Sequence, residues 1–184
     1  MIFLTCLSLL ACGPMGDSGT QAPAIEFNDL QGSSHTLAKP ERPTLVGFFI
    51  SNCGYCKNMM GVLNDVSAKH RDIEVYGFYL NPGSDGDISS AAQQYDFSGT
   101  VVAAQQRPEL IQTLASTFAI RGPGRDAYVI DKAGAVHSVS LVDGSSQFLS
   151  QADVEAKLED LIAKADGSSA SAPAAGGSET SLIH

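Results

Sequence analysis

Residues 45–56 read LVGFFISNCGYC, and this stretch decides the fold of the chain. Its first six residues are apolar or Gly, a composition typical of a buried strand. After the second cysteine, apolar residues recur at helical spacing, which predicts a helix over about residues 55–69. Cys53 is therefore predicted to lie where a strand ends and a helix begins.

This position favours a reactive thiol. The free N–H groups and the positive end of the helix dipole at a helix start stabilise an anion, and here that anion would be a thiolate. The thiolate, not the thiol, is the form of cysteine that attacks disulfides. We expect Cys53 to be the attacking residue and Cys56 to be the resolving residue of a redox-active pair.

Other roles for a close cysteine pair fit the sequence less well. A structural disulfide over so short a loop would stabilise little, since a loop of about 15 residues contributes only about 3 kcal/mol. A zinc site takes about four ligands, and none of the four histidines stands at ligand spacing from the pair. Two unreactive thiols in the core are the remaining alternative.

The N-terminus has the pattern of a secretion signal. Residues 1–11 are apolar apart from Thr5 and Ser8, and they are too few to span a bilayer, which takes about 20 residues. Residues 9–12, Leu-Leu-Ala-Cys, resemble the bacterial lipobox, although no Lys or Arg precedes Cys12. This resemblance implies that residues 1–11 are a lipoprotein signal peptide and that a lipidated Cys12 anchors the protein to a membrane.

Composition divides the rest of the chain. Residues 12–22 are rich in Gly, Ser, Pro and Thr and are predicted to be a flexible tether. Residues 23–165 are predicted to form one domain, and residues 166–184, rich in Gly, Ser, Ala and Pro, a disordered tail. The net charge of −9 argues against nucleic acid as a partner. Four cysteines behind a secretion-like segment are compatible with an oxidising compartment.

Strand and helix patterns alternate through the predicted domain. We expect, in order, a hairpin within 25–37, a strand at 44–50, the helix at 55–69, a strand at 73–80, a helix at 88–95 capped by Asp87, a strand at 100–104, a helix at 108–118, a hairpin formed by 127–130 and 135–141, and a C-terminal helix. This order predicts an α/β sandwich with a mixed sheet.

The order of elements, with the cysteine pair after the first core strand, resembles the thioredoxin superfamily and, within it, the membrane-tethered TlpA/ResA-like and redoxin branch. The entry segment 23–32, the stretch 45–56 and the segment 128–134 carry the resemblance. It implies a thioredoxin-like fold, a three-layer α/β/α sandwich with a mixed central sheet and a helical insertion around 84–105. It also implies a thiol–disulfide oxidoreductase that acts on protein thiols and disulfides without cofactor or metal.

The chain departs from the family pattern around the cysteines. Asn52 stands where family members usually have Trp, and Gly47 stands where thioredoxins keep a buried carboxylate that moves protons. Met59 stands where some tethered relatives place a glutamate. The group that takes the proton from Cys56 is therefore unassigned.

Two residues compete for the place of the family's cis-proline, which faces the cysteine pair. Counting back from the strand at 127–130, that place falls at Arg125, whereas Pro123 lies two residues earlier. Either Pro123 takes the part in a shifted loop, or Arg125 pairs with the Cys53 thiolate, as an arginine does in peroxiredoxins. Tyr55, between the cysteines, is expected to be exposed and to line a substrate groove.

The sequence thus predicts a lipid-anchored thiol–disulfide oxidoreductase on the extracytoplasmic side of the bacterial cell envelope, with catalytic residues Cys53 and Cys56. Two alternatives use the same cysteines: a redoxin-type thiol peroxidase, and a carrier of a soft metal ion such as Cu(I). His35 and His137 are predicted to be surface residues rather than metal ligands.

Overall fold

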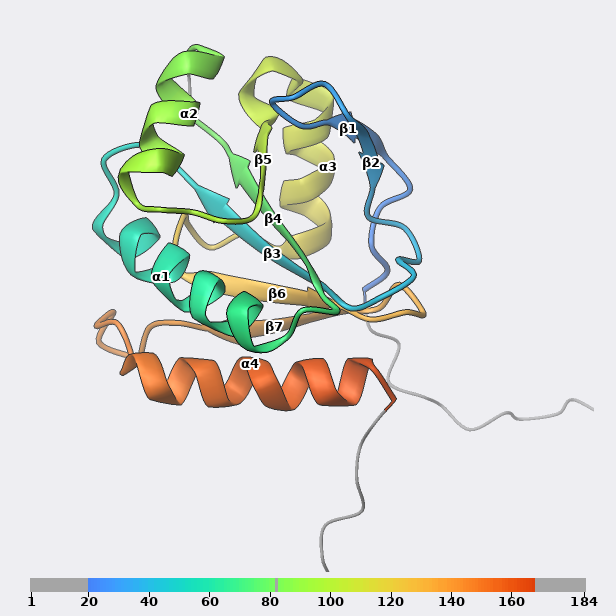
Figure 1. Cartoon of the computed structure of the whole chain (residues 1–184), viewed down its shortest axis with the longest axis vertical. Coiled ribbons are helices and arrows are strands. Elements are labelled where there is room, and N and C mark those ends of the chain that lie inside the picture. Colours follow the sequence, from blue (N-terminus) through green and yellow to red (C-terminus); the bar gives the residue numbers. More distant parts are fainter. Residues whose placement is uncertain (1–19, 82, 168–184) are drawn as a thin grey trace, which may run out of the picture.

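The central sheet has five strands in the order β5-β4-β3-β6-β7 (Figure 1). The parallel strands β3 (Thr44–Phe49), β4 (Glu74–Tyr79) and β5 (Thr100–Ala103) form one half, β6 (Asp126–Ile130) runs antiparallel to β3, and β7 (Val136–Ser140) runs antiparallel to β6. This is a computed structural model, and it describes residues 20–81 and 83–167. The predicted mixed sheet is confirmed.

Helices cover both faces of this sheet, which gives three layers (Figure 1). One face carries the helices α1 (Gly54–Lys69), α2 (Asp85–Gln94) and α4 (Gln151–Ala165). The other face carries α3 (Pro108–Phe118) and the hairpin of β1 (Glu26–Asn28) and β2 (Ser34–Thr36). The predicted three-layer sandwich with an inserted helix is confirmed, and the insertion is α2.

Strand β3 shows why its sequence is apolar without interruption. Leu45 and Phe49 pack into the cluster on the α1 face, whereas Val46 and Phe48 pack into the cluster on the α3 face. A strand covered on both faces needs apolar side chains at every position. β3 therefore lies in the middle of the core and holds the start of α1, which follows it, in a fixed place.

The start of α2 corrects one prediction. Asp87 was expected to cap this helix, but the cap is Ser84, whose Oγ accepts a hydrogen bond from the Asp87 N–H at 3.2 Å. The Asp87 carboxylate returns the bond to the Ser84 N–H at 2.9 Å. The two residues thus form a capping box, in which the acidic residue stands three positions after the cap.

Predictions for the two ends fall mainly outside the described residues. The signal peptide, Cys12 and nearly all of the tail lie there. Of the predicted tether, residues 20–22 are described, and they pair with the β6–β7 turn: the Val136 N–H donates to the Thr20 carbonyl at 2.7 Å. Within residues 20–81 and 83–167, no helix combines the length and the apolar character needed to cross a membrane.

Candidate functional site

Cys53 and Cys56 form a disulfide at the junction of β3 and α1, with their Cα atoms 5.1 Å apart. Cys53 is the N-cap residue of α1, and its Sγ accepts a hydrogen bond from the Cys56 N–H at 3.1 Å. The two residues differ in exposure: Cys53 is partly exposed, whereas Cys56 is fully buried at 0%. The predicted pair is thus brought together, with a partly exposed first cysteine and a buried second cysteine.

The same geometry would stabilise a thiolate on Cys53 once the disulfide is reduced. A backbone N–H that points at the sulfur and the positive end of the α1 dipole both favour the charged form. Cys53 also has the extended backbone conformation that is typical of an N-cap residue, with φ −114° and ψ 114°. A helix start built in this way favours nucleophilic attack by Cys53.

The loop before β6 faces the cysteine pair. The Pro123 carbonyl oxygen lies 3.9 Å from the Cys53 Sγ. None of the described peptide bonds is cis, so Pro123 approaches the disulfide in a trans loop. Of the two candidates for the cis-proline place, Pro123 is the one whose backbone contacts the Cys53 sulfur.

Gly124 makes the closest approach of this loop to the pair. Its φ is +71°, and its N–H donates to the Phe48 carbonyl at 2.9 Å. A Cβ on Gly124 would lie 2.5 Å from the Cys56 backbone nitrogen. Glycine is therefore required here for both conformation and space. Sequence reasoning missed this residue, although the Gly-Pro-Gly sequence at 122–124 was a usable signal.

Arg125 lies beside Tyr55. Its guanidinium carbon is 5.7 Å from the centroid of the Tyr55 ring, and its Nη2 donates to the Ser146 Oγ at 2.8 Å. The Tyr55 hydroxyl donates to the Ser146 carbonyl at 2.6 Å. Tyr55 is 37% exposed, as expected. Ser146, which joins these two side chains to the β7–α4 loop, was not predicted; the turn-forming Asp-Gly-Ser at 143–145 is its only sequence signal.

An ion pair closes the base of the loop that carries Pro123. The Asp126 carboxylate is 4% exposed, and it accepts a hydrogen bond from the Arg121 Nε at 3.0 Å and another from the Arg121 Nη2. The carboxylate holds the pKa of Arg121 above its ordinary value through these bonds. The two residues flank the loop 122–125, so the pair fixes the loop's two ends to each other.

A family model described as the AhpC/TSA family matches residues 18–139. The matched span is more than half of the chain and includes both cysteines. The chain belongs to the AhpC/TSA family. No curated protein matched it.

Solved structures confirm the thioredoxin-like fold of this AhpC/TSA member. A thiol:disulfide interchange protein DsbE from Chlorobium tepidum has 21% identity and a TM-score of 0.62, covering 81% of this chain and 98% of that chain. A secreted disulfide oxidoreductase of Mycobacterium tuberculosis has 14% identity and a TM-score of 0.59, covering 74% and 96%. BsSco, a Sco-family cytochrome c oxidase assembly protein, has 13% identity and a TM-score of 0.59, covering 79% and 95%. The resemblance to thioredoxin-like thiol–disulfide oxidoreductases is confirmed.

The departures from the family pattern have visible structural counterparts. Asn52 has φ +58°, a left-handed conformation that Asn tolerates better than Trp would. A Cβ on Gly47 would lie 2.8–2.9 Å from atoms of Phe49, Leu63 and Met59. The space that a carboxylate side chain at position 47 would need is therefore filled by apolar side chains, and Met59 itself is fully buried.

His35 and His137 are both hydrogen-bonded to carboxylates. His35 was predicted to be a surface residue, but it is half-buried, with its Nε2 2.8 Å from the Asp29 carboxylate and its Nδ1 3.2 Å from the Tyr76 hydroxyl. His137 is more exposed and lies 3.1 Å from the Asp131 carboxylate. Among the described residues, no group of three or more His, Cys, Asp or Glu side chains could hold a metal ion.

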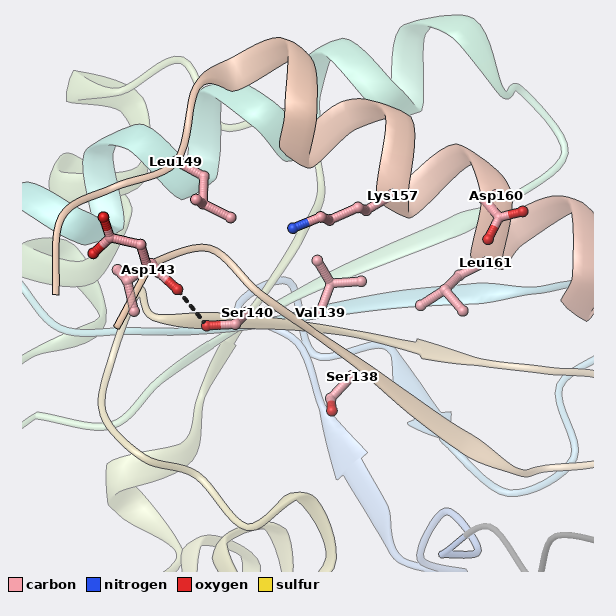
Figure 2. A pocket seen from close by; sticks show the side chains of 9 residues that line it. Ser138, Val139, Ser140, Asp143, Leu149, Lys157, Asp160 and Leu161 are labelled. Atoms are coloured by element: carbon pink, nitrogen blue, oxygen red, sulfur yellow. Dashed lines mark hydrogen bonds between the residues drawn. The ribbon is translucent and has the colours of Figure 1, made fainter. Parts of the chain in front are cut away.

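A groove of about 440 Å³ lies between β7 and α4, away from the disulfide. Figure 2 shows the Lys157 side chain extending from α4 over Val139, with Ser140 and Asp143 near one end of the groove. Neither cysteine lines it. The loop that carries Ser146 borders this groove, since Val142 and Asp143 line it.

Proposed function

We propose that this protein exchanges disulfides with partner proteins through Cys53 and Cys56 on the extracytoplasmic side of a bacterial membrane. One observation carries the proposal: a bonded pair at a helix start whose first cysteine is partly exposed and whose second cysteine is buried. An accessible N-terminal sulfur can meet a partner's disulfide. A buried second sulfur reacts within the molecule instead.

In the reductive direction, the Cys53 thiolate attacks one sulfur of the partner's disulfide. The partner's S–S bond breaks, its other sulfur leaves as a thiolate, and a mixed disulfide forms. Cys56 then loses its proton and attacks the Cys53 sulfur, which releases the partner's first sulfur as a second thiolate. Two electrons have passed to the partner, which takes up two protons, and the Cys53–Cys56 disulfide has formed. The reverse sequence oxidises a partner dithiol.

The proton of Cys56 has no dedicated acceptor in this scheme. Gly47 and Met59 replace the carboxylates that related proteins are expected to use. We propose that water or hydroxide, entering when Cys53 is drawn into the mixed disulfide, removes the proton. The rate of the resolving step should then rise with pH until the Cys56 thiol is itself ionised, without an earlier transition from an internal base.

We propose that a lipidated Cys12 holds the domain at the membrane. The Leu-Leu-Ala-Cys sequence at 9–12 supports this anchor. The likeness to a protein described as secreted supports the extracytoplasmic location alone. Expression in a bacterium fed an alkyne-labelled fatty acid tests it. The full chain should become labelled and a Cys12→Ala variant should not; equal labelling of the two would exclude the anchor.

Trapping of mixed disulfides tests the exchange function. Cys56→Ala leaves Cys53 able to attack but removes the resolving thiol, so partner proteins should stay bound to it through a bond that dithiothreitol releases. Cys53→Ala is the matched control and should trap far less. Equal capture by the two variants would contradict the assigned roles.

The AhpC/TSA match favours one second candidate, a thiol peroxidase. In that reaction the Cys53 thiolate would attack one oxygen of a hydroperoxide, the O–O bond would break, and the other oxygen would leave as an alcohol or as water. The sulfenic acid formed on Cys53 would then condense with the Cys56 thiol to give the Cys53–Cys56 disulfide and water. Mixing the reduced protein with one equivalent of hydrogen peroxide decides between the two. Loss of the peroxide within seconds favours a peroxidase, and slow loss over many minutes favours protein disulfide exchange.

A further inference from the structure

A polar pocket of about 440 Å³ lies next to the segment that leads into Cys53. Ser51 and Asn52, the two residues before Cys53, form one wall, and Asp87, Ser90 and Gln94 of α2 line the pocket from another element. β4 lies on one side of β3 and β6 on the other. The pocket is lined in part by Asn81 and Gly83, which come after β4 in the chain. The Pro123 loop comes just before β6. Because β3 lies between β4 and β6, Cys53, which follows β3, lies between the pocket and the Pro123 loop.

The charge of the pocket is negative. Asp87 supplies a carboxylate, and the remaining lining residues are hydroxyl, amide or small residues, with no Lys, Arg or His among the described residues that line it. Hydrogen bonds from the side chain and the backbone N–H of Ser84 lower the pKa of Asp87. Asp87 is therefore ionised at neutral pH.

The walls of the pocket are already fixed. The Ser51 N–H donates to the Asn81 Oδ1 at 3.0 Å, which joins the segment before Cys53 to the end of β4. The Gln105 Nε2 donates to the Gly83 carbonyl at 3.2 Å. The capping box of Ser84 holds Asp87 in place. Most ligand sites are preformed in this way, with a few fixed polar groups that set specificity.

We propose that this pocket is a subsite of the exchange site and takes the side chain of a Lys or Arg close to the partner's reactive cysteine. The inference rests on the proposed function, because it assigns the pocket to the polypeptide that brings a disulfide to Cys53. An extended chain advances about 3.3 Å per residue, so a residue two or three positions from that cysteine can reach a pocket beside Cys53.

Peptide disulfides test the subsite. The substrates are the oxidised dimers of Lys-Gly-Cys-Gly-Lys and of Gln-Gly-Cys-Gly-Gln, and the measurement is the rate at which the reduced protein reacts with each at low ionic strength. We expect the Lys peptide to react about threefold faster, the size of effect that one exposed charge pair supports. Asp87→Asn should bring the ratio of the two rates close to one.

Two further variants separate the effect of the Asp87 charge in the pocket from the effect of the protein's overall charge and from damage to α2. Asp72→Asn removes the same charge from an exposed position before β4, at the far end of that strand from the pocket, and should leave the ratio at its wild-type value. Ser90→Lys places a cation beside Asp87 without touching the capping box. It cancels the charge of the pocket and should bring the ratio close to one, even if Asp87→Asn disturbs α2.

The outcomes distinguish the subsite from the function. If the wild-type protein reacts with both peptides at the same rate, or if Asp72→Asn lowers the ratio as much as Asp87→Asn, the subsite is refuted and the exchange function stands. If neither peptide reacts although small disulfides reoxidise Cys53 and Cys56, the proposed function fails and the subsite fails with it.

Discussion

Cys53 and Cys56 stand three positions apart but occupy different environments. Cys53 is the partly exposed N-cap residue of α1, and its Sγ accepts a hydrogen bond from the Cys56 N–H. Cys56 packs among apolar side chains on the α1 face of the sheet. A cap position lies outside the helix and faces solvent more readily than a position in its first turn. The asymmetry of the site thus follows from where the helix begins.

Selective alkylation measures this asymmetry. In the reduced protein, Cys53 should react with iodoacetamide at least about tenfold faster than Cys56, because the thiolate is the reactive form and access to Cys56 is blocked. Peptide mass analysis after brief labelling gives the two rates. Faster labelling of Cys56 would reverse the assigned roles.

Gly124 combines a positive φ with a close contact to the Cys56 backbone. Comparing its substitution by Ala with that of Gly32 separates the cost of the positive φ from the cost of the close contact. Gly124→Ala should lower the free energy of unfolding by at least about 2 kcal/mol, because a Cβ 2.5 Å from the Cys56 nitrogen forces the loop away from the disulfide. Gly32 also has a positive φ, +84°, but a Cβ there meets nothing within 4 Å. Gly32→Ala should therefore cost only about 1 kcal/mol. Urea unfolding measures both, and equal losses would contradict the close approach.

At the scale of elements, the loop between α3 and β6 depends on one ion pair. Arg121→Gln would leave the buried Asp126 carboxylate without its cation and should lower the free energy of unfolding by about 2 kcal/mol, less than for a fully buried pair because Arg121 is 63% exposed. Arg42→Gln, in an exposed pair with Glu74, is the control and should cost under about 1 kcal/mol.

A double variant completes the test of the ion pair. Asp126→Asn added to Arg121→Gln removes the stranded charge and should recover part of the lost stability. If Arg121→Gln costs no more than Arg42→Gln in urea unfolding, the pair does not hold the loop.

The elements were largely predictable because each has a local signal. The apolar run of β3, the helical spacing after Cys56 and Pro108 at the first turn of α3 all act within a few residues. The cap of α2 was misassigned because Ser84 and Asp87 are both good cap residues, and only their mutual hydrogen bonds show which one caps.

The site was predictable only where its chemistry is local. The cysteine pair is contained in four residues, but Gly124 and Ser146 meet Tyr55 and Cys56 across about 70 to 90 positions of sequence. Whether Arg125 contacts the sulfur or the Tyr55 ring depends on the course of the β7–α4 loop. No local pattern encodes that course.

At the scale of the whole molecule, stability should depend on pH through carboxylates with hydrogen-bonded partners. The hydrogen bond from His35 to Asp29 lowers the pKa of Asp29 in the folded protein. Such a group stabilises the fold above its unfolded pKa of about 3.9, and the contribution is lost as the pH falls through the lower folded value.

Comparison with Asp29→Asn isolates this contribution. The wild-type protein should be more stable than the variant at pH 6, and the gap should narrow as the pH falls below about 4. Urea unfolding across this range measures the gap, with Asp72→Asn as the exposed control. A gap that widens on acidification would contradict a lowered pKa for Asp29 in the folded protein.

Redox titration of Cys53 and Cys56 in glutathione buffers tests the central claim most directly. The fraction of disulfide, read from the mass added by alkylation of the free thiols, should follow a single two-electron transition, with a tenfold change in the equilibrium ratio for about every 30 mV. Both thiols should disappear together as the buffer becomes oxidising. Two results would contradict the account: both cysteines remain free thiols that can be alkylated at every potential, or the disulfide is not reduced at any potential.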